Sequence, residues 1–109
     1  MPFTPEEEYE LDKQAIELWG IEAQLDQLCE ECAELIVAVH HLKRGRVDGR
    51  DVAEELADVQ NCLNQFKDVF PDVEKIRQEK LDRFARLLRV SNPNPECPKN
   101  RPSPCETIK

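Results

Sequence analysis

Apolar residues recur in steps of three and four along two stretches of the chain, and this rhythm restricts the possible fold more than any other feature. The first stretch comprises Ile21, Leu25, Leu28, Cys32, Leu35, Val39 and Leu42. The second comprises Val52, Leu56, Val59, Leu63, Phe66 and Phe70. Such spacing gives a helix one apolar face that needs a neighbouring helix as cover. Residues 44–50 contain two glycines and no periodicity, so we expect a helical hairpin with its loop there.

A further helix is expected before the hairpin. Thr4 and Glu7 form a T-x-x-E capping box, and Pro5 suits the first helical position, so the helix should begin near Pro5. It should run to about Leu18 or Trp19. The glycine that follows, at position 20, either bends the chain or is absorbed into a longer helix.

A fourth helix is expected from Pro71 onward, with apolar residues at Val73, Ile76, Leu81, Phe84 and Leu88. The predicted fold is therefore all-α: a helical hairpin with flanking helices, whose four-helix-bundle-like core is completed by oligomerisation. Residues 1–90 are expected to form this domain. Residues 91–109 hold five prolines and almost no apolar residue, which predicts a disordered tail.

The overall charge narrows the choice of partners. The 109 residues carry a formal net charge of -8, which disfavours nucleic acid polymers and anionic membrane surfaces as partners. No stretch approaches the length of an apolar membrane span, and the acidic N-terminal segment lacks the apolar core of a secretory signal. We therefore expect a cytoplasmic protein without membrane association. Its five cysteines, an odd number, favour reduced thiols over a disulfide framework.

Four carboxylates stand beside the apolar faces of the two hairpin helices: Glu31 with Glu34, and Glu55 with Asp58. Each pair has the spacing i, i+3, which places its members on the same side of a helix. Each acid also directly precedes an apolar residue of its helix, so both helices hold their acids at the rim of the packed face. Converging carboxylates repel unless a cation joins them, and an all-oxygen site suits Mg²⁺ or Mn²⁺. The alternative interpretation is an ordinary solvated helix face.

Two other groups of charged residues are candidates for a functional role. Glu30 lies beside Glu34 at the spacing i, i+4 and is either a proton acceptor or a surface residue. Lys80 and Arg83 form part of a basic stripe in an otherwise acidic chain, which could bind phosphates. Their alternative role is pairing with acidic neighbours of their own helix.

The acidic pattern resembles that of the MazG-like nucleoside triphosphate pyrophosphohydrolases, an all-α family marked by E-E-x-x-E, a spacer and E-x-x-D. The matching residues here are Glu30, Glu31, Glu34, Glu55 and Asp58. The similarity extends to Gln24 before the first motif and to residues 79–84, EKLDRF, whose Lys80 and Arg83 match a late basic pair of the family. It spans roughly residues 19 to 88.

The resemblance implies that Glu31, Glu34, Glu55 and Asp58 bind Mg²⁺, with Mn²⁺ as a possible substitute. It implies hydrolysis of a nucleoside triphosphate to a nucleoside monophosphate and pyrophosphate, in which a water polarised by the metal attacks the α-phosphorus. The candidate catalytic residues are Glu30 and Glu31. The candidate substrate-binding residues are Gln24, Asn61, Lys80 and Arg83, of which the last two would hold the outer phosphates and Asn61 is a candidate for base recognition. The family also implies a homodimer or homotetramer with helices packed across subunits.

Two alternatives stay open at this point. One is a relative specialised for dUTP, dCTP or phosphoribosyl-ATP. The other is a helical interaction module without enzymatic activity, whose apolar faces serve only assembly. Such a module needs the apolar faces but not the acids beside them, so the presence of all four acids favours an enzyme.

Overall fold

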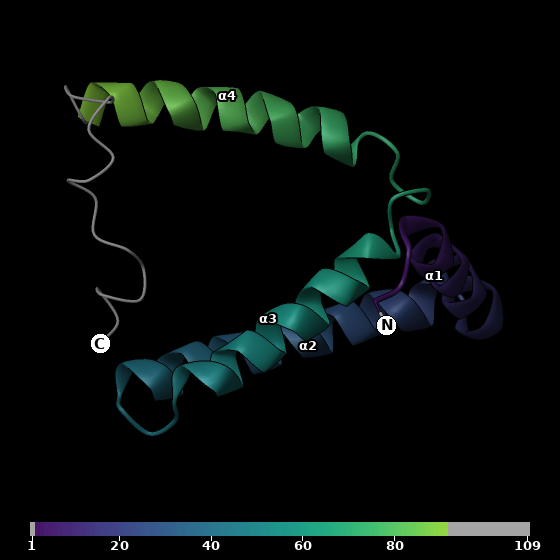
Figure 1. The fold of residues 1–109 in the computed structure, drawn as a ribbon, viewed down its shortest axis with the longest axis horizontal. Helices are drawn as coiled ribbons and strands as arrows, with labels where there is room; N and C mark the ends of the chain where they lie inside the picture. Colours follow the sequence, from purple (N-terminus) through teal and green to yellow (C-terminus); the bar gives the residue numbers. More distant parts are fainter. Residues whose placement is uncertain (1, 92–109) are drawn as a thin grey trace. The chain divides into compact units, whose positions relative to one another are not determined.

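The computed structural model describes residues 2–91, and this part of the chain is helical with no strand (Figure 1). Its elements are α1 (Pro5–Trp19), α2 (Ile21–Lys43), α3 (Gly49–Asn64) and α4 (Val73–Ser91). The all-α prediction is confirmed. The predicted disordered tail, residues 91–109, lies outside the described residues except for Ser91, which is the last residue of α4. Across residues 2–91, no helix combines the length and apolar character needed to cross a membrane.

The start of α1 follows the capping box predicted from the sequence. The Glu7 backbone N–H donates to Thr4 Oγ1 at 3.1 Å, and the Thr4 backbone N–H donates to Glu7 Oε1 at 2.8 Å. Pro5 occupies the first helical position. Further along α1, the Tyr9 hydroxyl donates to Asp68 Oδ2 at 2.5 Å, which ties α1 to the segment after α3. This hydrogen bond to a carboxylate raises the pKa of Tyr9.

Gly20 separates α1 from α2. Its φ of 89° and ψ of 155° lie in a region that is essentially restricted to glycine, so the chain bends here instead of continuing as one helix. The Gly20 N–H still donates to the Ile16 carbonyl at 2.8 Å, and the Gly20 carbonyl accepts from the Gln24 N–H at 3.1 Å. One residue thus ends one helix and begins the next.

The predicted hairpin is confirmed, because α2 packs mainly against α3 (Figure 1). The loop between them contains Gly45 at a φ of 72° and ends at Asp48, whose carboxylate caps α3 by accepting from the Arg50 N–H at 3.0 Å. The most buried apolar side chains, Val59, Cys62 and Phe66, belong to the second half of α3 and the turn that follows. The core of the hairpin therefore lies toward this end of α3.

Two helix boundaries differ from the sequence prediction. The apolar rhythm continues to Phe70, but α3 ends at Asn64 and turns follow. Phe66 stays buried all the same, with its ring centroid 6.1 Å from that of Phe70, so the turns preserve the apolar pattern without helical backbone. The fourth helix begins at Val73 instead of Pro71. The Asp72 carbonyl accepts the first helical hydrogen bond, from the Ile76 N–H at 3.0 Å, which makes Asp72 the N-cap.

The chain divides into two compact units, Met1–Pro71 and Asp72–Lys109, and this boundary lies inside the range 1–90 predicted as one domain. The first unit contains α1, α2 and α3, and its Cys29, Cys32 and Cys62 are free thiols. In the second unit, α4 is braced along its surface by ion pairs between Arg77 and Glu74 and between Arg86 and Asp82. Such exposed pairs stabilise a helix only slightly.

The backbone conformation of Gly20 predicts that alanine destabilises the protein more at this position than at Gly49. Because a Cβ at Gly20 would meet no atom within 4 Å, Gly20→Ala should be destabilised by backbone strain alone, by about 1–3 kcal/mol. Gly49→Ala is the matched control, since its Cβ is equally unobstructed and its φ is not positive; it should be neutral or stabilising by up to about 1 kcal/mol. Urea denaturation of both variants measures the difference. Equal stability of the two would contradict the assigned bend.

Candidate metal centre

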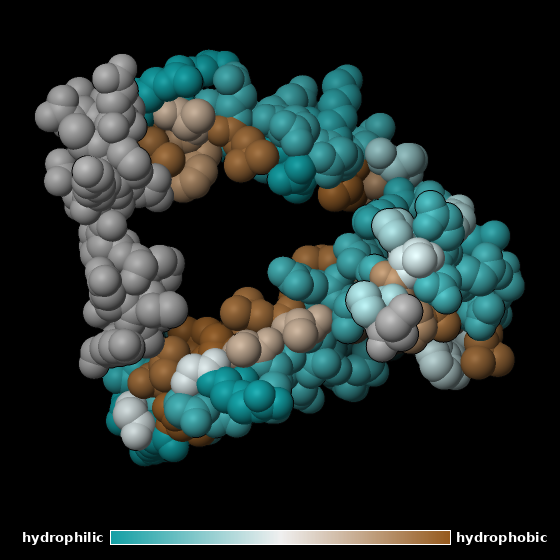
Figure 2. Space-filling model, viewed as in Figure 1, coloured by the Kyte–Doolittle hydropathy of each residue, from teal (hydrophilic) through white to brown (hydrophobic). Residues whose placement is uncertain are grey.

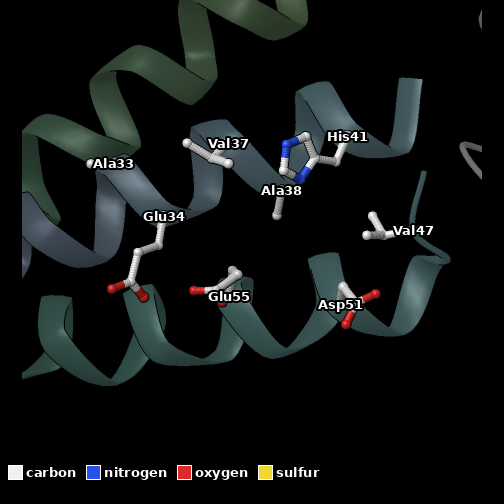
Figure 3. Close-up of a pocket in the computed structure, with 8 residues that line it drawn as sticks. All are labelled: Ala33, Glu34, Val37, Ala38, His41, Val47, Asp51 and Glu55. Carbon is white, nitrogen blue, oxygen red and sulfur yellow. The ribbon is translucent and has the colours of Figure 1, made fainter. Parts of the chain in front are cut away.

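Three of the predicted acids converge between the hairpin helices. Glu31 and Glu34 come from α2 and Glu55 from α3, and each offers a carboxylate oxygen within 4.8 Å of the others. Figure 3 shows the Glu34 side chain extending from α2 toward Glu55 on α3. The hairpin produces this arrangement because its loop returns α3 alongside α2. Glu31 and Glu55 are half-buried and Glu34 is exposed, so the cluster opens to solvent on the Glu34 side.

The pKa of Glu55 reflects its burial and the close approach of the neighbouring acids. Burial raises the pKa of Glu55, and the negative charges of Glu34 and Asp58 raise it further. Hydrogen bonding to Glu34 and the charge of Glu31 act in the same direction. A cation bound beside Glu55 would act on its pKa in the opposite direction.

The protein itself supplies little to offset this charge. Glu31 Oε2 and Glu55 Oε2 are both buried without a hydrogen-bond partner. In residues 2–91, the ion pairs join other residues, such as Arg50 with Glu54, and none reaches the three glutamates. Buried polar atoms are normally paired, and a bound water or ion is one of the explanations for an exception. Carboxylate oxygens are the ligands preferred by Mg²⁺ and Mn²⁺, so the residues present fit a divalent cation of this class.

Gln27 contacts the cluster, and the sequence analysis assigned it no role. Its amide nitrogen Nε2 donates to Glu31 Oε1 at 2.7 Å, one helical turn away on α2. The signal was available in the spacing i, i+4, at which glutamine and an acid meet on a helix. What the spacing could not show is that this amide binds one oxygen of Glu31 and leaves the other unpartnered.

Three further candidates lie near the cluster without joining it. Asp58 is exposed on α3, three residues beyond Glu55, and its charge contributes to the raised pKa of Glu55. It is not part of the group whose oxygens lie within 4.8 Å. Glu30 is exposed on α2 next to Glu31, and Asn61 is exposed on α3 one turn beyond Asp58. The structure thus unites three of the four predicted ligands and places the fourth beside them.

Gln24 has a structural contact of its own. It is only 7% exposed, and its Nε2 donates to Gln65 Oε1 at 3.0 Å. This hydrogen bond links α2 to the turn after α3, next to the buried Phe66. Lys80 and Arg83, the remaining candidates, are exposed on α4, which belongs to the second unit.

A groove with a volume of about 430 Å³ adjoins the glutamates (Figure 3). Its lining consists of Ala33, Glu34, Val37, Ala38, His41, Val47, Asp51 and Glu55. Both hairpin helices and their loop contribute, and the walls are mostly apolar with polar groups from His41 and Asp51. The volume lies within the range of small-molecule sites. The sequence did not predict this groove, because Val47 reaches it only through the conformation of the loop.

Comparisons with protein-family models, curated proteins and solved structures found no match to this chain. Its family and activity accordingly stay proposals that rest on the residues described above.

Replacing Glu55 tests the repulsion within the cluster. In the absence of metal, Glu55→Gln should melt a few degrees higher than the wild type, because it removes one of the crowded charges. Wild-type stability should also fall as the pH rises through the raised pKa of Glu55, since the folded chain holds this proton more tightly than the unfolded chain. Glu55→Gln should lose this component of the pH dependence.

Glu54→Gln is the matched control, because Glu54 is exposed and pairs with Arg50 at 3.1 Å outside the cluster. Its melting temperature should change little. Thermal melts followed by circular dichroism in a chelator measure both variants. A lower melting temperature for Glu55→Gln than for Glu54→Gln would argue against repulsion among the glutamates.

Proposed function

We propose that this protein is an Mg²⁺-dependent hydrolase of the MazG-like kind, which converts nucleoside triphosphates to nucleoside monophosphates and pyrophosphate. The observation that carries the proposal is the convergence of Glu31, Glu34 and Glu55 from two helices, with buried and unpartnered oxygens on Glu31 and Glu55. A solvated helix face, the alternative interpretation, gives its carboxylates access to water or to a basic partner.

In this proposal the three glutamates hold the cation, and Asp58 joins them by a change of side-chain rotamer. A bound Mg²⁺ would supply neutralisation of the triphosphate charge and polarisation of the attacking water. The half-buried carboxylates restrict water around the ligand oxygens, while the exposed Glu34 side leaves a path for substrate. Binding also relieves the mutual repulsion that raises the pKa of Glu55.

The reaction needs positioning and charge more than a nucleophilic side chain. A water molecule attacks the α-phosphorus, the bond between this phosphorus and the oxygen bridging to the β-phosphorus breaks, and pyrophosphate leaves. Glu30 or Glu31 accepts the proton of the water. The groove beside Glu34 and Glu55 has room for a nucleoside. Lys80 and Arg83, exposed on α4, stay candidates for phosphate binding. Asn61 is a candidate for contact with the base, and Gln24 supports the site by holding α2 against the turn after α3.

A second candidate function, a helical interaction module, is favoured by the extent of exposed apolar surface. Leu18 is 72% exposed, Trp19 61% and Ile36 58%, whereas Val59, Cys62 and Phe66 are the buried apolar residues in the described part of the chain. Figure 2 shows apolar side chains on the surface of the hairpin. An oligomeric enzyme accounts for the same surface, because its subunits cover one another's apolar faces.

A nucleotide panel decides between the two functions. With Mg²⁺ or Mn²⁺ present, we expect triphosphates to yield a monophosphate and pyrophosphate, and the panel should include dUTP, dCTP and phosphoribosyl-ATP. The assay must distinguish pyrophosphate from orthophosphate. Release of orthophosphate alone would indicate cleavage at the γ-phosphate and refute the proposed reaction, and absence of any turnover would favour the interaction module.

Variants at the cluster supply the matching test of the site. Glu34→Gln and Asp58→Ala should lower kcat/KM by at least about a hundredfold while retaining helicity, as expected when ligands of an essential metal are lost. Glu54→Gln should retain wild-type activity, since Glu54 pairs with Arg50 outside the cluster. Near-normal activity of Glu34→Gln and Asp58→Ala would refute the site assignment.

The exposed apolar surface also predicts assembly. We expect a homodimer or homotetramer at micromolar concentration, because apolar side chains such as Trp19 and Ile36 would otherwise contact water. Sedimentation velocity of the purified chain measures the state directly. A monomer throughout this range would contradict the prediction.

A further inference from the structure

Gln27 forms a hydrogen bond with only one of the two oxygens of the Glu31 carboxylate. Its amide Nε2 donates to Oε1 at 2.7 Å in a partly buried position. Oε2 is buried and has no hydrogen-bond partner. Glu31 is also one of the three glutamates whose carboxylate oxygens approach within 4.8 Å. One oxygen is therefore held from within α2, while the other has no hydrogen-bond partner in the protein.

The chemistry of the donor matters as much as its position. Rotation about the last side-chain bond of glutamate is broad, so an unrestrained carboxylate samples many orientations. A hydrogen bond to one oxygen limits this rotation before any cation arrives. An amide is neutral, so it orients Glu31 and leaves intact the negative charge that attracts a cation. A lysine or arginine in its place would cancel that charge.

We propose that Gln27 is a positioning residue that sets the affinity of the glutamate cluster for a divalent cation by fixing the orientation of Glu31. This inference rests on the metal site of the proposed function and adds a residue that does not itself contact the cation. Partners that orient metal ligands typically contribute tenfold to a hundredfold in affinity. Loss of the Gln27 amide should therefore weaken cation binding by about this factor.

The test is a titration with Mn²⁺ alone, without nucleotide, followed by calorimetry and by electron paramagnetic resonance. Gln27→Leu and Gln27→Met both remove the donor, and both substitutes are good helix formers of similar size. Each should raise the dissociation constant for Mn²⁺ by about tenfold or more. Gln78→Leu is the matched control, because Gln78 Nε2 donates to Glu74 Oε1 at 3.1 Å across the same spacing on α4, outside the cluster. Its Mn²⁺ affinity should equal that of the wild type.

Thermal melts of the same proteins separate positioning from general stabilisation. A merely structural role for Gln27 would lower the melting temperature and leave the Mn²⁺ dissociation constant unchanged, and that result would overturn the proposal. Wild-type protein that binds no Mn²⁺ would overturn it together with the metal site. Wild-type protein that binds Mn²⁺ but hydrolyses no nucleotide, with weakened binding in both Gln27 variants, would support the positioning role and refute only the proposed hydrolase.

Discussion

Repulsion among carboxylates at the contact between α2 and α3 is the interaction on which the candidate site depends. The packing of the two helices brings Glu31, Glu34 and Glu55 together, and burial denies part of them the water that would screen their charge. Burial of apolar residues on the same helix offsets this repulsion. Val59 and Cys62, which follow Glu55 on α3, are buried and hold the helix against its neighbour. The same contact between α2 and α3 thus buries apolar side chains and brings the acidic side chains together. Preorganised charge of this kind favours cation binding, since the ligands are already gathered before the ion arrives.

Much of the helical architecture could be predicted because its signals are local. The capping box of Thr4 and Glu7 fixes where α1 begins, and the glycines of residues 44–50 indicate the hairpin loop. The end of α3 could not be predicted from periodicity, because the turn after Asn64 also buries an apolar residue, Phe66. Periodicity reports which side of the chain is covered, and it does not require every covered residue to be helical.

The candidate site, too, could be predicted only in part from the sequence. Spacing placed Glu31 and Glu34 on one side of α2 and Glu55 with Asp58 on one side of α3, but spacing gives the direction of a side chain and not its depth or rotamer. Spacing therefore could not show that Asp58 lies beside the group of three instead of within it. The groove next to Glu34 depends on how the loop places Val47, which no local pattern encodes.

The residues that form the cluster all belong to one hairpin with a short loop. Closing a short loop costs little chain entropy, and contacts between neighbouring segments form early during folding. A cation bound by Glu31, Glu34 and Glu55 would therefore stabilise the pairing of α2 with α3 itself. Ion binding at the candidate site would thus be coupled to the packing of two helices, so an ion present during folding would favour the closed hairpin over its separated helices.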